Sequence, residues 1–116
     1  RSVAAAYDAA FAQLPGVEIP FRASDSRHVF HQYTLKLTSH SRAALQAHLQ
    51  AAGIPSMIYY PIPAHRQNMF SKFNLGHLHL PLTEALCEQV ISLPIHTEMD
   101  EQQLDYIIQH VLSFFK

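Results

Sequence analysis

Residues 29–37, VFHQYTLKL, carry side chains that alternate in type along the whole stretch. On one face of an extended chain lie Val29, His31, Tyr33, Leu35 and Leu37, and on the other lie Phe30, Gln32, Thr34 and Lys36. This alternation predicts a strand with one face in the core. His31 falls on the apolar face, so we expect an interior histidine with satisfied hydrogen bonds, with a substrate contact as the alternative.

Before this strand, residues 1–14 predict an amphipathic helix that stops at Pro15-Gly16. Its apolar face carries Val3, Ala6, Tyr7, Ala10, Phe11 and Leu14. Residues 17–21 predict a short strand, and the polar residues 22–27 predict a loop.

After the strand, Ser39 or Ser41 is a candidate N-cap for a helix that runs to about Ala52, where Gly53 ends it. Its buried side is expected to carry Leu45, Leu49 and Ala52. Residues 54–59 predict a return to strand.

The last part of the chain predicts a helix over 83–90, a short extended piece at 92–94 and a final helix over 100–115. Asp100 with Gln103 three residues later forms a capping-box pattern at the start of that helix. The order helix, strand, strand, helix, strand, helix, helix predicts an α+β domain with a small, largely antiparallel sheet packed against helices.

Composition narrows the class of protein. The chain has 116 residues, 48% hydrophobic and 15% charged, which suits one globular domain with a modest core. Its net charge of -1 gives no indication of nucleic acid or an anionic membrane as partner. Cys87 is the only cysteine and cannot form an internal disulfide, so we expect a cytoplasmic setting. We interpret Cys87 as a structural thiol. Because residue 1 is Arg1 and not Met, we expect a chain cut from a longer one.

Isolated histidines and lysines give weak indications of chemistry. His77 and His79 would face the same way in a strand, but no third or fourth ligand stands at a recognisable spacing, so we assign no metal. Lys36, Lys72 and Lys116 lie on a polar strand face, in a loop and at the terminus, where desolvation for Schiff-base chemistry is not expected.

Residues 58–67, IYYPIPAHRQ, gather rigid and polar groups in one loop. In one interpretation the tyrosines pack and the prolines only shape a connection. In the other, the stiff Pro61-Ile62-Pro63 path holds hydrogen-bonding groups at a domain edge, where they reach phosphate and sugar oxygens. These groups are Tyr59, Tyr60, His65 and Gln67.

Three stretches resemble, in order, the C-terminal domain of the DegT/DnrJ-type sugar aminotransferases: HVFHQYTLKL, RAALQAHLQAAGIPSMIYYPIPAHRQNMF and LPLTEALCEQVISLPIHTEMDEQQLDYIIQHV. They cover nearly all of residues 28–111, and YDAAFAQLPGVEIP is similar to the segment leading into that domain. The resemblance implies a leading helix at 1–14 and, at 15–116, the small domain of a fold-type-I aminotransferase.

In that family a larger N-terminal domain holds most of the pyridoxal phosphate site, and the enzymes are typically homodimers. The resemblance therefore implies amino transfer, usually from glutamate, to a nucleotide-linked keto sugar, with this chain inactive alone. It implies sugar-nucleotide contacts from Tyr59 and Tyr60, then His65, then Gln67. Relatives often carry a histidine at the first tyrosine and a leucine before the histidine. The difference at Tyr59 could change which phosphate oxygen is reached. Arg66 matches no functional position and is expected to be a surface residue.

Two other classes stay open at this point. One is a stand-alone α+β module that binds a ligand or partner without catalysis. The other is a histidine-based metal protein, which metal analysis would reveal.

Overall fold

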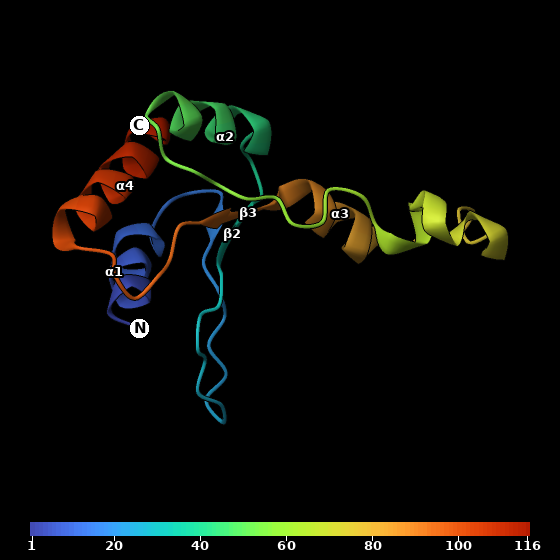
Figure 1. Cartoon of the computed structure of the whole chain (residues 1–116), viewed down its shortest axis with the longest axis horizontal. Coiled ribbons are helices and arrows are strands. Elements are labelled where there is room, and N and C mark those ends of the chain that lie inside the picture. The colour runs from blue at the N-terminus through green and yellow to red at the C-terminus, as the bar shows by residue number, and fades with distance from the viewer.

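The computed structural model describes all 116 residues and confirms the α+β class (Figure 1). Its elements are α1 (Ser2–Phe11), β1 (Val17–Glu18), β2 (Tyr33–Leu37), α2 (Arg42–Ala51), the 3-10 helices η1 (Ala64–Arg66) and η2 (Asn68–Phe73), α3 (Pro81–Gln89), β3 (Val90–Leu93) and α4 (Glu101–Phe114). No helix has the length and apolar character needed to cross a membrane.

The sheet has three antiparallel strands in the order β1-β2-β3, which confirms the prediction of a small, largely antiparallel sheet. β2 is the central strand, pairing Leu37 with Val17 and Tyr33 with Leu93. The predicted alternation holds in this part of the strand, where Tyr33, Leu35 and Leu37 are buried. The sheet therefore presents one apolar face to the helices.

The helices α1, α2 and α4 lie together, with α4 in contact with both of the others (Figure 1). Ser41 caps α2, and the capping box of Asp100 and Gln103 begins α4, as predicted. Side chains from all three helices and from the sheet form one core of 16 buried residues. The buried residues of α1 are part of this core. The boundary between a leading helix at 1–14 and the small domain at 15–116 stays a prediction.

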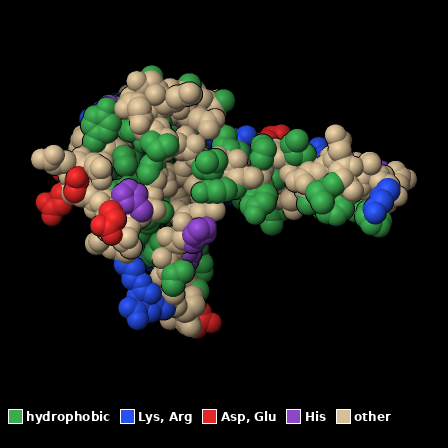
Figure 2. Space-filling view, viewed as in Figure 1, with side chains coloured by type: hydrophobic (Ala, Val, Ile, Leu, Met, Phe, Trp, Pro, Cys, Tyr) green, Lys and Arg blue, Asp and Glu red, His purple; other side chains and the backbone are tan.

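Two segments project from this body (Figure 1). Residues 19–32, which we call the finger, connect β1 to β2. Residues 61–89, which we call the arm, contain η1, η2 and α3. Figure 2 shows hydrophobic side chains on the surface along the arm. The exposed ones include Ile62, Met69, Phe73, Leu80 and Leu82.

The predicted strand at 29–37 is wrong in its first half, which belongs to the finger. Phe30 adopts a left-handed backbone with φ of 54°, and this reverses the alternation. Phe30 is therefore buried while Val29 is 76% exposed. His31 is exposed and not interior, so our expectation for it is also wrong.

The predicted strand at 54–59 is likewise wrong, since only Met57 pairs, in an isolated bridge with Ser92. Pro55 has no N–H to donate to a ladder, and a bend follows within a few residues. Two predicted elements are shorter than expected: the first helix ends at Phe11, and the first strand spans only Val17–Glu18.

Candidate functional site

Tyr59 and Tyr60 line two adjacent clefts at the base of the finger. Tyr59 borders a cleft of about 280 Å³ together with Ser56 and His96. Tyr60 borders a second cleft of about 410 Å³ together with His28. Both tyrosines keep much of their surface free, with 49% of Tyr59 and 72% of Tyr60 exposed.

His31 and Gln32 line both clefts and so join them into one surface. We call this surface the tyrosine face: Tyr59, Tyr60, His31 and Gln32. No lysine, arginine, aspartate or glutamate lines either cleft. Phenol, imidazole and amide groups donate and accept hydrogen bonds without a fixed charge. The tyrosine face is therefore equipped to bind and orient a polar ligand.

The base of the finger is fastened to α1, which fixes the direction of His31 and Gln32. Tyr33, directly after them, donates its hydroxyl to Asp8 Oδ1 at 2.8 Å. Arg22 on the other side of the finger pairs with the same carboxylate, and its guanidinium lies over the Phe30 ring at 4.4 Å. Burial, and then the hydrogen bond to Asp8, raise the pKa of Tyr33 above its ordinary value. Tyr33 therefore stays a neutral donor.

His65 and Gln67 lie apart from the tyrosine face and line neither of its clefts. Gln67 donates from Nε2 to the carbonyl of Ile62 at 3.1 Å, which stabilises the loop itself. His65 is buried and contacts Glu84 of α3. The four residues singled out in the sequence thus form one exposed pair and one pair held within the loop and arm.

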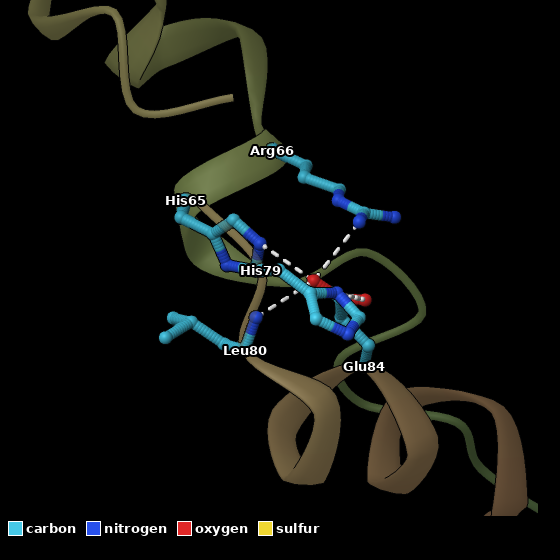
Figure 3. A network of polar contacts seen from close by, with 5 residues as sticks. All are labelled: His65, Arg66, His79, Leu80 and Glu84. Carbon is cyan, nitrogen blue, oxygen red and sulfur yellow. Dashed lines mark hydrogen bonds and ion pairs between the residues drawn. The ribbon is translucent and has the colours of Figure 1, made fainter. Parts of the chain in front are cut away.

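Glu84 is the centre of a network that joins η1 to the start of α3 (Figure 3). Its Oε1 is 3.3 Å from His65 Nε2, 2.9 Å from Arg66 Nη2 and 3.0 Å from the Leu80 backbone N–H. Its Oε2 is 3.2 Å from His79 Nδ1. The Leu80 N–H most of all, then Arg66, His79 and His65, hold the pKa of Glu84 below its usual range, although burial opposes them.

The sequence did not single out Glu84. A signal was present: Pro81 is the first residue of α3, and an acid in the first turn after such a proline accepts free backbone N–H groups. No three His, Cys, Asp or Glu side chains are arranged to hold a metal ion, in this network or elsewhere in the chain. Cys87 is a buried free thiol, as predicted.

A further cleft, of about 460 Å³, lies between residues 53–55 and the first turns of α4. It contains Tyr106, whose hydroxyl donates to the Ala52 carbonyl at 3.0 Å. Only His96 among its side chains is an imidazole, and no acid or base partners it there. This cleft has no grouping that indicates chemistry.

Comparison with known proteins gives consistent matches. The sequence model of the DegT/DnrJ/EryC1/StrS aminotransferase family matches residues 1–112. A pleiotropic regulatory protein of Geobacillus stearothermophilus is 35% identical over 86% of this chain and 26% of its own length. A UDP-N-acetyl-3-dehydro-alpha-D-glucosamine 3-aminotransferase of Acidithiobacillus ferrooxidans is 42% identical over 76% of this chain and 23% of its own length.

Among solved structures, S. venezuelae DesV in complex with a ketimine intermediate superimposes with a TM-score of 0.90. It is 31% identical over 99% of this chain. The chain covers 30% of that structure, and about a quarter of each of the two curated relatives described above.

Proposed function

The chain belongs to the DegT/DnrJ/EryC1/StrS aminotransferase family, and from this premise we propose that it is the small C-terminal domain of a sugar-nucleotide aminotransferase. The proposed reaction moves an amino group from an amino acid, glutamate in our proposal, to a ketone on a nucleotide-linked sugar. Relatives named as aminotransferases of UDP- and dTDP-linked sugars support this substrate class.

The cofactor of the proposed enzyme is pyridoxal phosphate, but the residues of this chain do not fit a complete site for it. Such a site needs a lysine in a desolvated position. Lys36 is paired with Glu18 at 3.1 Å, Lys72 lies over the exposed Phe73 ring, and Lys116 is exposed at the end of the chain. We therefore propose that the cofactor is held mainly by a larger domain outside these residues.

We propose that the tyrosine face binds the sugar nucleotide. The observation that carries this proposal is the placement of Tyr59 and Tyr60, both exposed, beside His31 and Gln32 at the base of the finger. Phenol hydroxyls donate to phosphate oxygens, and the imidazole and amide can bond sugar hydroxyls. His65 and Gln67 remain part of the proposal as weaker candidates, because each already has a partner within the chain.

The assembly of the full-length protein is also a proposal. The exposed hydrophobic side chains of the arm would contact the larger domain or a second subunit, because an isolated domain rarely leaves many such groups uncovered. We propose a homodimer in the cytoplasm, without nucleic acid or membrane as partner.

Separate measurement of the two half-reactions in the full-length protein tests this function. With Tyr60→Phe or Tyr59→Phe, we expect the half-reaction with the keto-sugar nucleotide to slow roughly ten- to a hundredfold, as for loss of a hydrogen bond to a charged group. The half-reaction with glutamate should keep its rate. Stopped-flow absorbance of the cofactor follows both steps.

The matched control is Tyr106→Phe, which removes a tyrosine hydroxyl on α4 outside the tyrosine face. It should leave both half-reactions unchanged. Equal losses in both half-reactions for Tyr60→Phe would assign that tyrosine to packing. A full-length protein without cofactor absorbance would favour the second candidate, a module without catalysis, for which the relative named as a regulatory protein gives some support.

A further inference from the structure

The Glu84 carboxylate is oriented by its own helix before it meets the loop at 58–67. Its Oε1 accepts from the Leu80 N–H at 3.0 Å, a backbone group at the start of α3. The Glu84 side chain is 17% exposed, so most of its surface is covered. A carboxylate fixed in this way is a rigid acceptor for whatever the loop places beside it.

The loop places the His65 ring there, and the contact decides which ring nitrogen carries the proton. The ionised carboxylate of Glu84 can only accept, so His65 Nε2 donates across the 3.3 Å contact. In a neutral ring with hydrogen on Nε2, the lone pair is on Nδ1. The ring's hydrogen bond within the chain uses Nε2 and leaves Nδ1 without a partner. Every fully buried side-chain nitrogen or oxygen in the chain has a hydrogen-bond partner, so Nδ1 cannot be fully buried. This nitrogen is thus an acceptor at the edge of a buried ring.

The other two side chains that contact Glu84, Arg66 and His79, are more exposed than His65. The Arg66 and His79 side chains are 48% and 76% exposed. Ion pairs at such exposed positions contribute little, because water and salt screen them. His65, whose side chain is 6% exposed, is the partner whose orientation depends most on the carboxylate.

We propose that Glu84 is a positioning residue that locks His65 in the Nε2–H tautomer (Figure 3) and leaves Nδ1 as a hydrogen-bond acceptor that is not fully buried. An acceptor pairs with a hydroxyl group and not with a phosphate oxygen, which is itself an acceptor. Where His65 meets the ligand, it therefore recognises a hydroxyl of the sugar nucleotide. This last step rests on the proposed function, whereas the tautomer lock does not.

Nitrogen-15 spectra of the full-length protein, labelled on histidine and recorded at pH 8, test the lock. His65→Gln assigns the signals of His65 by their disappearance. We expect Nε2 of His65 to be protonated and Nδ1 to be unprotonated in the wild type and in Glu84→Gln, whose amide oxygen still accepts. In Glu84→Ala the preference should be lost. A His65 ring protonated on Nδ1 in the wild type, or a tautomer unchanged in Glu84→Ala, would overturn the proposal.

Kinetics of the same variants test the hydroxyl contact with a different readout. Glu84→Ala should raise KM for the keto-sugar nucleotide about tenfold and leave the glutamate half-reaction unchanged, while Glu84→Gln should recover most of the loss. Glu88→Ala, at an exposed position of the same helix, is the matched control and should change neither. A lock confirmed by the spectra with KM unchanged supports Glu84 as a positioning residue and removes His65 from the proposed sugar-nucleotide site.

Discussion

Replacement of Tyr33 by phenylalanine tests how the finger is held against the body of the domain. The change removes one hydroxyl from a fully buried ring and leaves the packing against Tyr7, whose ring centroid is 4.9 Å away, intact. The lost bond is the 2.8 Å contact with Asp8, which keeps its pairing with Arg22. Only the Tyr33 interaction is therefore tested.

The expected loss of stability is about 1.5 kcal/mol, the lower end for a hydrogen bond to a charged group, because Asp8 retains a partner and its side chain is 22% exposed. Urea denaturation of the chain measures it. With a slope of roughly 1–3 kcal/mol per molar urea, the midpoint should fall by roughly 0.5–1.5 M. Tyr106→Phe removes an exposed hydroxyl and should cost less than about 0.5 kcal/mol. If the two variants lost equal stability, the Tyr33 contact would not fasten the finger.

Tyr33 should also make the stability of the fold depend on pH in the alkaline range. The pKa of Tyr33 in the folded chain lies above its ordinary value of 10.0, so above about pH 10 the unfolded chain loses this proton while the folded chain keeps it. Stability should therefore be intact below pH 10 and fall as pH rises further. Tyr33→Phe should reduce that fall, and the buried Tyr7, whose pKa burial also raises, accounts for part of the remainder.

Two further results are expected. The pKa of Glu84 in the folded chain lies below its ordinary value of 4.5, so the ionised carboxylate stabilises the fold above pH 4.5, and this stabilisation is lost as pH falls through the folded pKa. The urea midpoint should therefore drop less between pH 7 and pH 3.5 in Glu84→Gln than in the wild type. Equal drops in the two proteins would contradict the network. Gly16 and Gly53 both have left-handed backbones, but a Cβ at Gly53 meets no atom whereas one at Gly16 would collide with the Ser39 hydroxyl. Gly53→Ala should cost about 1 kcal/mol and Gly16→Ala more, measured by thermal unfolding, and the reverse order would contradict the packing described.

The parts of the fold that follow local rules could be predicted from the sequence. The caps at Ser41 and Asp100 depend on side chains within three residues, and the buried face of β2 depends on simple alternation. Phe30 could not be predicted in the same way, because a left-handed backbone at a phenylalanine has no local signal. It is held by His28, whose Nδ1 accepts from the Phe30 N–H at 3.0 Å, and by the Arg22 guanidinium above its ring.

The sequence shows only the part of the candidate site that lies within one continuous stretch. The loop of Tyr59 and Tyr60 is visible in the sequence as a rigid, polar stretch, but the residues beside it in space come from other segments. The alternation predicts an interior position for His31 only if it continues through Phe30, and the left-handed backbone of Phe30 breaks it. Glu84 is 19 residues from His65 along the chain, and only the folded arm brings them together.

A crystal structure of the full-length protein with its keto-sugar nucleotide and coenzyme would show whether the tyrosine face contacts the ligand. We predict phosphate or sugar oxygens within hydrogen-bond distance of the Tyr59 and Tyr60 hydroxyls, with His31 and Gln32 lining the same pocket. A sugar nucleotide bound with these four side chains facing solvent or another subunit surface, away from the ligand, would contradict it.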